Sequence, residues 1–222
     1  MSIIHRTTLT PGKLELLTSW LPTQPWYLGT GREPVLSKSG GFRLDDPRGE
    51  VGLEFMAATD ECGDRPVTYH VPLSYRGAPL DGADEALLGT SEHGVLGRRW
   101  IYDGTHDPVL VAQLLALLQG RAEPQAQSVN DTPDPSVTVH FAGTGVATGV
   151  VSSTVVNGPH DTRLTVNTAS EPARRLTLQV TRVLRPGEGA PADATGHVTA
   201  HWRFPEDHEN RAVFALLHPT AS

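Results

Sequence analysis

Residues 66–75, "PVTYHVPLSY", carry the pattern around which the fold is predicted. Apolar side chains recur at every second position, and this period is typical of a strand with one buried face. Proline cannot donate a hydrogen bond to a neighbouring strand, so Pro72 indicates an edge position or a bulge. We therefore expect a half-buried strand here and a sheet around it. The apolar positions are Val67, Tyr69, Val71, Leu73 and Tyr75.

The rest of the first half predicts more strands and a buried helix. In the segment 106–119, "HDPVLVAQLLALLQ", Asp107 is a suitable helix cap and Pro108 suits the first helical position. Leucines cover most faces of this helix, so we expect it to be buried against the sheet. The strands around "PVTYHVPLSY" are expected at 34–44, 50–59, 85–90 and 95–103, with the turn "TSEHG" between the last two.

A shorter helix is expected near the start of the chain. Thr10 is a suitable N-cap, Pro11 suits the first helical position, and apolar residues follow at mostly helical spacing. Pro22 should end this helix because proline removes a backbone donor. The aromatic residue Trp20 falls on its apolar face.

The second half is predicted to be rich in strands. Residues 122–135, "AEPQAQSVNDTPDP", have no apolar period and are expected to form a linker. We therefore divide the chain into an α+β domain at 1–121, a linker at 122–135 and a β-rich segment at 136–222. The segment "VVNGPHDT" supplies a hairpin turn. Strands are expected at 137–142, 148–156, 162–168, 174–184, 196–204 and 211–217.

Composition describes an ordinary, mildly acidic soluble protein. The chain has 222 residues, 38% hydrophobic residues and a net charge of -7. This balance argues against nucleic-acid binding, which favours a basic face. No stretch approaches the roughly 20 apolar residues of a membrane helix. A lone cysteine, Cys62, fits a reducing cytoplasm. We expect a cytoplasmic protein without a cofactor.

The aromatic segment at 20–32, "WLPTQPWYLGTGR", has two interpretations. Trp26 and Tyr27 beside polar turns can form a platform for sugar rings. Alternatively, they pack the corner between the first helix and the first strand, with glycines permitting the next turn. Both interpretations stay open on the sequence.

The densest polar cluster lies in "TSEHG" (90–94) and "YDGTHD" (102–107). His93, Asp103 and His106 are residue types that can ligate a metal or hold an acid–base pair. The structural alternative is that Asp103 forms a turn with the glycine that follows it while Asp107 caps the helix. No established metal-binding or nucleophile motif accompanies the cluster, and we expect no metal.

Five segments in collinear order resemble the N-terminal cap domain of actinobacterial maltokinases, a cap also found on related glucosamine kinases. They cover roughly half of the chain. The resemblance implies a curved antiparallel sheet with a helix against it, likened to the cystatin fold. The strand pattern of the second half predicts a second, mostly antiparallel sheet segment after it. The segments are "WLPTQPWYLG" (20–29), "VGLEFMAATD" (51–60), "TYHVPLSYRG" (68–77), "ALLGTSEHG" (86–94) and "IYDGTHDPVLVAQLLALL" (101–118).

The second half weakly resembles the start of the kinase N-lobe that follows this cap in the family. The lysine that pairs with ATP phosphates is matched by Gln179, which lacks the positive charge, and its glutamate partner falls near Ala194. The two lysines of the chain, Lys13 and Lys38, lie in the first half. Beyond residue 204 the sequence is too short for a C-lobe of ordinary domain size. We expect a degenerate N-lobe remnant and no self-sufficient kinase.

Three functions follow from these observations. The first is a non-catalytic, stand-alone, cap-like accessory protein in α-glucan, maltose or trehalose metabolism, which pairs with a separate enzyme of that pathway. The second is a small-ligand or glucan-binding protein that uses Trp26, Tyr27 and their neighbours. The third is an enzyme of unrecognised type that uses His93, Asp103 and His106. Homodimerisation through exposed sheet edges is compatible with all three.

Overall fold

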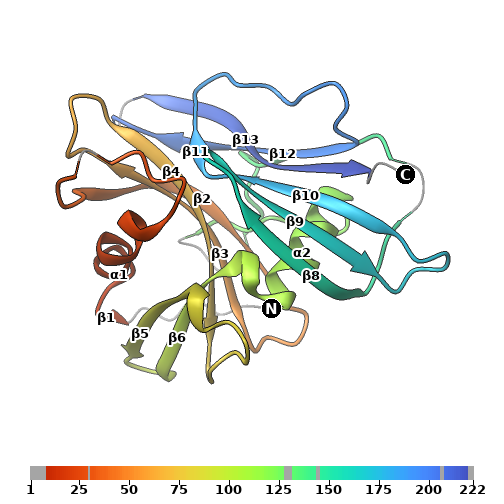
Figure 1. Ribbon diagram of the computed structural model, residues 1–222, viewed down its shortest axis with the longest axis horizontal. Coiled ribbons are helices and arrows are strands. Elements are labelled where there is room, and N and C mark those ends of the chain that lie inside the picture. Colours follow the sequence, from red (N-terminus) through yellow and green to blue (C-terminus); the bar gives the residue numbers. More distant parts are fainter. Residues whose placement is uncertain (1–8, 30, 128–131, 144–145, 206–207, 220–222) are drawn as a thin grey trace.

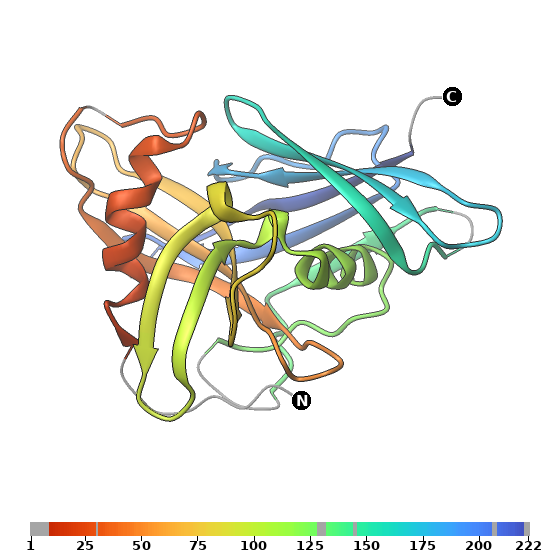
Figure 2. The same ribbon diagram turned by 60° about the horizontal axis from the view of Figure 1, so that its bottom comes forward.

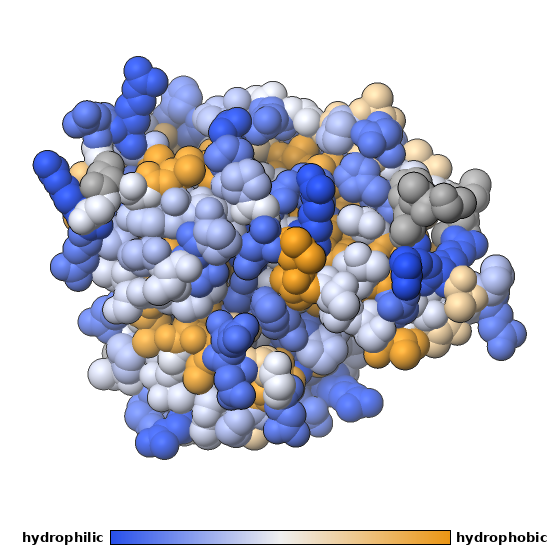
Figure 3. Space-filling view, viewed as in Figure 1, coloured by the Kyte–Doolittle hydropathy of each residue, from blue (hydrophilic) through white to orange (hydrophobic). Residues whose placement is uncertain are grey.

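Antiparallel strands from both halves of the chain form one open sheet in the computed structural model (Figure 1). The structure describes residues 9–29, 31–127, 132–143, 146–205 and 208–219. Two α-helices, α1 (Lys13–Trp20) and α2 (Pro108–Leu118), accompany the sheet. In the part of the chain described, no helix is long and apolar enough to cross a membrane. Polar side chains predominate on the face shown in Figure 3, where the apolar ones form small separate patches.

The observed strands follow the predicted ones closely. Both hairpins of the sequence interpretation are present, β5–β6 in the first half and β8–β9 in the second. The strands are β1 (Leu9–Thr10), β2 (Leu36–Leu44), β3 (Gly52–Asp60), β4 (Val67–Arg76), β5 (Leu87–His93), β6 (Gly97–Asp103), β7 (Thr138–Phe141), β8 (Val150–Asn157), β9 (Asp161–Thr168), β10 (Arg175–Thr181), β11 (Val183–Leu184), β12 (Gly196–Arg203) and β13 (Glu209–Pro219).

The order of the strands joins the two halves. The sheet runs β1-β5-β6-β4-β3-β2-β12-β13-β10-β9-β8, so the halves meet where β2 lies beside β12. A second connection is made by β11, which continues the chain from β10 but pairs with β4. The first half and the second half are therefore linked on two sides, and the residues between these links become interior.

The segment 66–75 forms β4, as its alternation predicts, but β4 lies inside the sheet and not at its edge. One side of β4 pairs with β3 along its whole length. On the other side, β4 has two partners. β11 pairs with Thr68 and Tyr69, and β6 pairs with β4 from Leu73 onward. Pro72 falls in the gap between these two partners. The missing donor is thus tolerated inside the sheet, because Pro72 has Phe55 opposite it on β3 but no ladder partner among the described residues on the other side of β4.

The core has a layer on each face of β3. Leu53, Phe55 and Ala57 contribute to the larger cluster, which includes α2 and strands of both halves. Met56 and Ala58 contribute to the smaller cluster under α1. Figure 2 shows α1 and α2 as separate helices on the first-half and second-half sides of the molecule. A strand buried on both faces explains the apolar run of its sequence.

The long helix forms as predicted, and the short one begins later. The Asp107 side chain accepts a hydrogen bond from the Val109 N–H, with Pro108 at the first helical position. The prediction that Thr10 caps α1 is wrong, because Thr10 lies in β1 opposite Glu92 and Gly12 is the N-cap. A long-range strand pairing has overridden the local capping signal.

The predicted linker lies against the sheet. Gln125 forms isolated bridges with Arg43 of β2 and with Pro133, and residues 128–131 lie outside the described part. The division into 1–121, 122–135 and 136–222 remains a prediction from the sequence. The cystatin likeness remains an expectation that rests on the family resemblance. In the structure, the segments on either side of 122–135 contribute to one sheet and to one core cluster.

Candidate functional site

The aromatic corner at 20–32 is packed into the protein. Trp26 is fully buried, with its ring centroid 5.8 Å from that of Trp20 and 5.9 Å from that of Tyr69. Tyr27 is half-buried; its hydroxyl donates to an Asp60 oxygen at 2.9 Å, and its ring lies on Tyr69. Burial and Asp60 raise the pKa of Tyr27. Trp26 is therefore closed to a ligand, while Tyr27 borders a shallow surface hollow.

The predicted polar cluster is divided between two ends of a hairpin. His93 lies at the β5–β6 turn, where its Nδ1 accepts from the backbone N–H groups of Val95 and Leu96. Asp103 ends β6, six residues from the turn, which places it about 20 Å from His93 at the rise of an extended strand. His106 follows in a short 3-10 turn (Gly104–His106). The structure does not bring the three residues into one site.

Asp103 instead belongs to a buried network centred on Arg182. The Arg182 Nη2 donates to an Asp103 oxygen at 2.5 Å and to the Thr105 hydroxyl at 3.2 Å, and its Nε donates to Thr162 at 2.7 Å. Its guanidinium carbon lies 4.8 Å from the centroid of the Trp26 ring. Arg182 is completely buried between β10 and β11, so it links residues of both halves. Nothing in the sequence around Arg182 indicates that this arginine is buried, because arginines in strands are mostly exposed.

A buried histidine lies beside this network. The His70 Nδ1 is 2.9 Å from the carbonyl oxygen of Thr181, and its ring packs on Phe55 and Phe214. Burial, followed by the charge of Arg182, lowers the pKa of His70 to about 3. The imidazole is therefore neutral at physiological pH.

The two lysines meet at a second buried charge. Lys13 Nζ donates to both Glu54 oxygens, at 2.6 and 2.8 Å, and Lys38 Nζ lies 3.6 Å from one of them. The Tyr75 hydroxyl and the Gln127 amide also donate to Glu54. Burial alone would raise the pKa of Glu54, but the two lysines outweigh it and hold that pKa below its ordinary value. The cluster anchors α1 and the 122–127 segment to β3.

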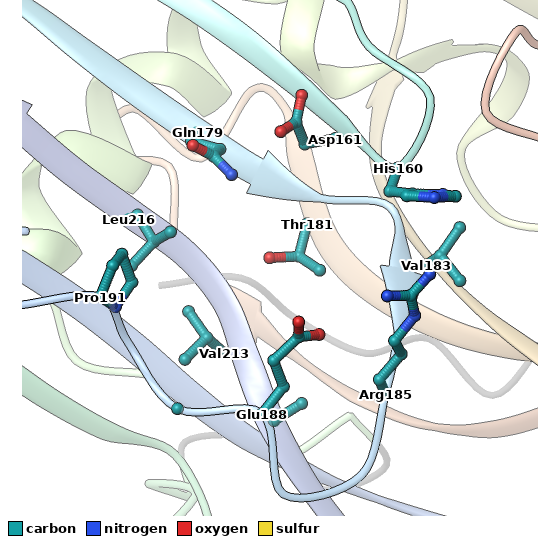
Figure 4. A pocket seen from close by; sticks show the side chains of 12 residues that line it. His160, Asp161, Gln179, Thr181, Val183, Arg185, Glu188, Pro191, Val213 and Leu216 are labelled. Carbon is teal, nitrogen blue, oxygen red and sulfur yellow. The ribbon is translucent and has the colours of Figure 1, made fainter.

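A cavity of about 380 Å³ opens on the outer face of β10 and β13 (Figure 4). Its floor is apolar, formed by side chains such as Val183, Val213 and Leu216. Figure 4 shows Arg185 and Glu188, on the loop after β11, reaching toward Thr181 from the other side. The remaining lining residues are His160, Asp161, Gln179, Gly189, Pro191 and Ala212.

Several polar groups of this cavity have no partner among the residues that the structure describes. In the described ranges, no hydrogen bond or ion pair involves the side chains of Gln179, Thr181, Arg185 or Glu188. Gln179 and Thr181 are nevertheless half-buried on regular strand, which fixes their position. Cavities of this volume with a few converging polar groups are typical small-ligand sites. The lining residues of the cavity are spread from His160 to Leu216 in the sequence, and the pairing of β9, β10 and β13 brings them together.

Residues 20–107 match the family model of the maltokinase N-terminal cap domain. The similarity to this cap domain thus applies to the segment 20–107 of the chain. The match begins at Trp20, the last residue of α1, and ends at Asp107, the cap of α2, so it contains β2 to β6. The resemblance inferred from the sequence is confirmed for this segment. Gln179, Arg182 and the cavity of Figure 4 lie beyond it.

We expect the ion pair between Arg182 and Asp103 to be costly to break. Arg182→Met or Asp103→Asn should each lower the free energy of unfolding by about 3 kcal/mol, because the remaining group keeps its burial and loses its partner. Urea denaturation followed by circular dichroism would measure this loss. The double variant should lose less than the sum of the two. Strictly additive losses would contradict a coupled pair.

Protonation of His70 in the unfolded state should lower the free energy of unfolding as the pH falls below about 6.5. The folded pKa of His70 is about 3, so the unfolded state binds a proton between these values and the folded state does not. Between pH 7 and pH 5 this group should cost about 2 kcal/mol. Urea denaturation at both pH values would show a smaller decrease for His70→Gln than for the unaltered protein. Equal decreases would contradict this assignment.

Proposed function

We propose that this protein is a non-catalytic accessory module of α-glucan, maltose or trehalose metabolism, and that the cavity of Figure 4 binds a small, neutral, hydroxyl-rich ligand. One observation carries the proposal: the strand residues Gln179 and Thr181 are held at fixed positions beside an apolar floor, and no residue in the described part of the chain pairs with their side chains. Unpaired polar groups at such a place are expected to meet a ligand or water. The cap-like domain supports the metabolic context.

The chemistry of the lining favours hydroxyl groups. The carboxylates of Asp161 and Glu188 accept hydrogen bonds, Arg185 donates them, and the amide of Gln179 does both. A polyhydroxylated molecule offers donors and acceptors to all of these groups at once. Val213 and Leu216 then supply an apolar surface for the C–H groups of a ring.

The charge of the lining favours neutral sugars over sugar phosphates as ligands. Asp161 is paired with Arg163 at 3.7 Å, which leaves the carboxylate of Glu188 to oppose a phosphate group and the guanidinium of Arg185 as the cation of the lining. The weak resemblance to a kinase N-lobe, which is a prediction from the sequence, aligns Gln179 with the ATP-binding lysine of a kinase. A neutral amide there supports binding of an uncharged sugar and a non-catalytic role, since it cannot neutralise phosphate charge.

We expect glucose, maltose or trehalose to bind the full chain with a dissociation constant between micromolar and millimolar values, and more tightly than the corresponding sugar phosphate. Isothermal titration calorimetry would measure both. Thr181→Val and Glu188→Gln should each weaken binding by about tenfold, because one hydrogen bond to the ligand is lost.

Glu171→Gln provides the matched control, because Glu171 is exposed on the β9–β10 turn away from the cavity. This variant should bind as the unaltered protein does. If none of the three neutral sugars gives a signal, or if the phosphates bind more tightly, the proposed ligand class is wrong.

The accessory role also implies a partner enzyme. We expect the purified protein to form a complex with one enzyme of the same pathway, such as a maltosyltransferase or a trehalose synthase. Sedimentation velocity of pairwise mixtures would reveal such a complex as a faster boundary. Unchanged boundaries for every pathway enzyme would contradict the partner, and would leave the calorimetric result on the cavity unaffected.

A further inference from the structure

The strand β8 forms an unusual end of the sheet. Among the described residues it pairs only with β9, and its other side faces no strand. At the opposite end, β1 has two residues and is followed by Pro11, which makes that edge short. With eight residues, β8 exposes a row of backbone N–H and C=O groups long enough to pair with another strand.

The sequence around β8 lacks the usual protection of an edge. Residues 142–159, "AGTGVATGVVSSTVVNGP", contain no charged side chain, although charged residues make up 19% of the chain. Val151 and Val156, at 69% and 65% exposure, are the most exposed large apolar side chains in the described ranges. Natural edge strands commonly carry lysine or proline, which prevents pairing with another molecule. β8 carries neither.

The strand is also nearly symmetric about its centre. Residues 150–156 read "VVSSTVV", which is the same in both directions apart from the exchange of serine and threonine. A second, antiparallel copy related by a two-fold axis at Ser153 sets valines opposite valines. Ser152 then lies opposite Thr154, so small hydroxyl side chains meet at the centre. Such self-complementarity is what a two-fold interface between identical chains requires.

We propose that two copies of this protein form a dimer by antiparallel pairing of their β8 strands. Net charge favours this edge over other surfaces: two chains of charge -7 repel each other, and an uncharged edge lets them approach at the lowest cost. The register of β8 against β9 shifts between Val150 and Ser152, and this bulge limits the regular pairing to the middle of the strand. Because the paired segment is short, we expect a reversible dimer. Added salt should strengthen the association by screening the repulsion between the two negatively charged chains.

The self-association can be measured by sedimentation equilibrium of the full chain between low micromolar and submillimolar concentrations. We expect a monomer–dimer equilibrium that shifts toward dimer in 0.5 M salt. Thr154→Lys should weaken association at least tenfold, because it sets two lysines at diagonal positions across the two-fold axis. Val156→Lys should weaken it as well, because it replaces a valine–valine pair with a lysine opposite Val150. Circular dichroism would confirm that both variants are folded.

Val95→Lys is the matched control, because Val95 is 62% exposed at the tip of the β5–β6 hairpin, far from β8 in the strand order. It should dimerise as the unaltered protein does. Oxidation of a Ser153→Cys variant, made with Cys62→Ser, tests the register: cysteines at the two-fold axis should cross-link two chains, whereas Val95→Cys should not.

Three results would overturn the proposal. The first is a monomer at every concentration, and the second is a dimer that Thr154→Lys and Val156→Lys leave unchanged. The third is open-ended association, which a closed two-fold contact excludes. None of these results depends on the sugar titration, so failure of the dimer and failure of the proposed function are distinguishable.

Discussion

The ion pair between Arg182 and Asp103 is the interaction on which the rest of the architecture depends. It lies where β10 leaves β13 and where β11 joins β4, and the Arg182 guanidinium also covers the Trp26 ring. Two charges without access to water are stable only when their geometry is satisfied, so the surrounding elements must be assembled together. The aromatic corner, the end of β6 and the second-half strands are thereby fixed relative to one another.

This arrangement also determines the outer face. Along β10, Leu178 and Val180 point into the core with Arg182, so Gln179 and Thr181 must point outward. The position of the buried arginine thus sets which residues line the cavity. The buried ion pair of Arg182 and the cavity thus lie on opposite faces of the segment formed by β10 and the residue after it.

Much of the sheet could be predicted from the sequence because it follows local patterns. The alternation in 66–75 and the cap of α2 at Asp107 are properties of short segments, and both form as expected. The start of α1 could not be predicted in the same way, because the pairing of Thr10 with Glu92 joins residues 82 positions apart. Pro72 shows a related limit: a proline signals a missing partner, but not whether the gap lies at an edge or inside the sheet.

The site was harder to predict than the fold. Closeness in sequence suggested a cluster of His93, Asp103 and His106, yet a hairpin carries residues at its turn and at its open end to opposite ends of two strands. Asp103 pairs with Arg182, and Gln179 and Glu188 line one cavity, although the members of each pair come from separate elements. Only strand order brings them together, and no local motif encodes it.

The Glu54 cluster has a consequence for the chemistry of the whole chain. Its two lysine side chains, Lys13 and Lys38, both lie against the same buried carboxylate. The reactivity of each lysine side chain therefore depends on one contact, the junction of α1, β2 and β3. Cleavage by a lysine-specific protease, or acylation at the two lysine side chains, therefore reports on that junction and gives no information on the strands of the second half.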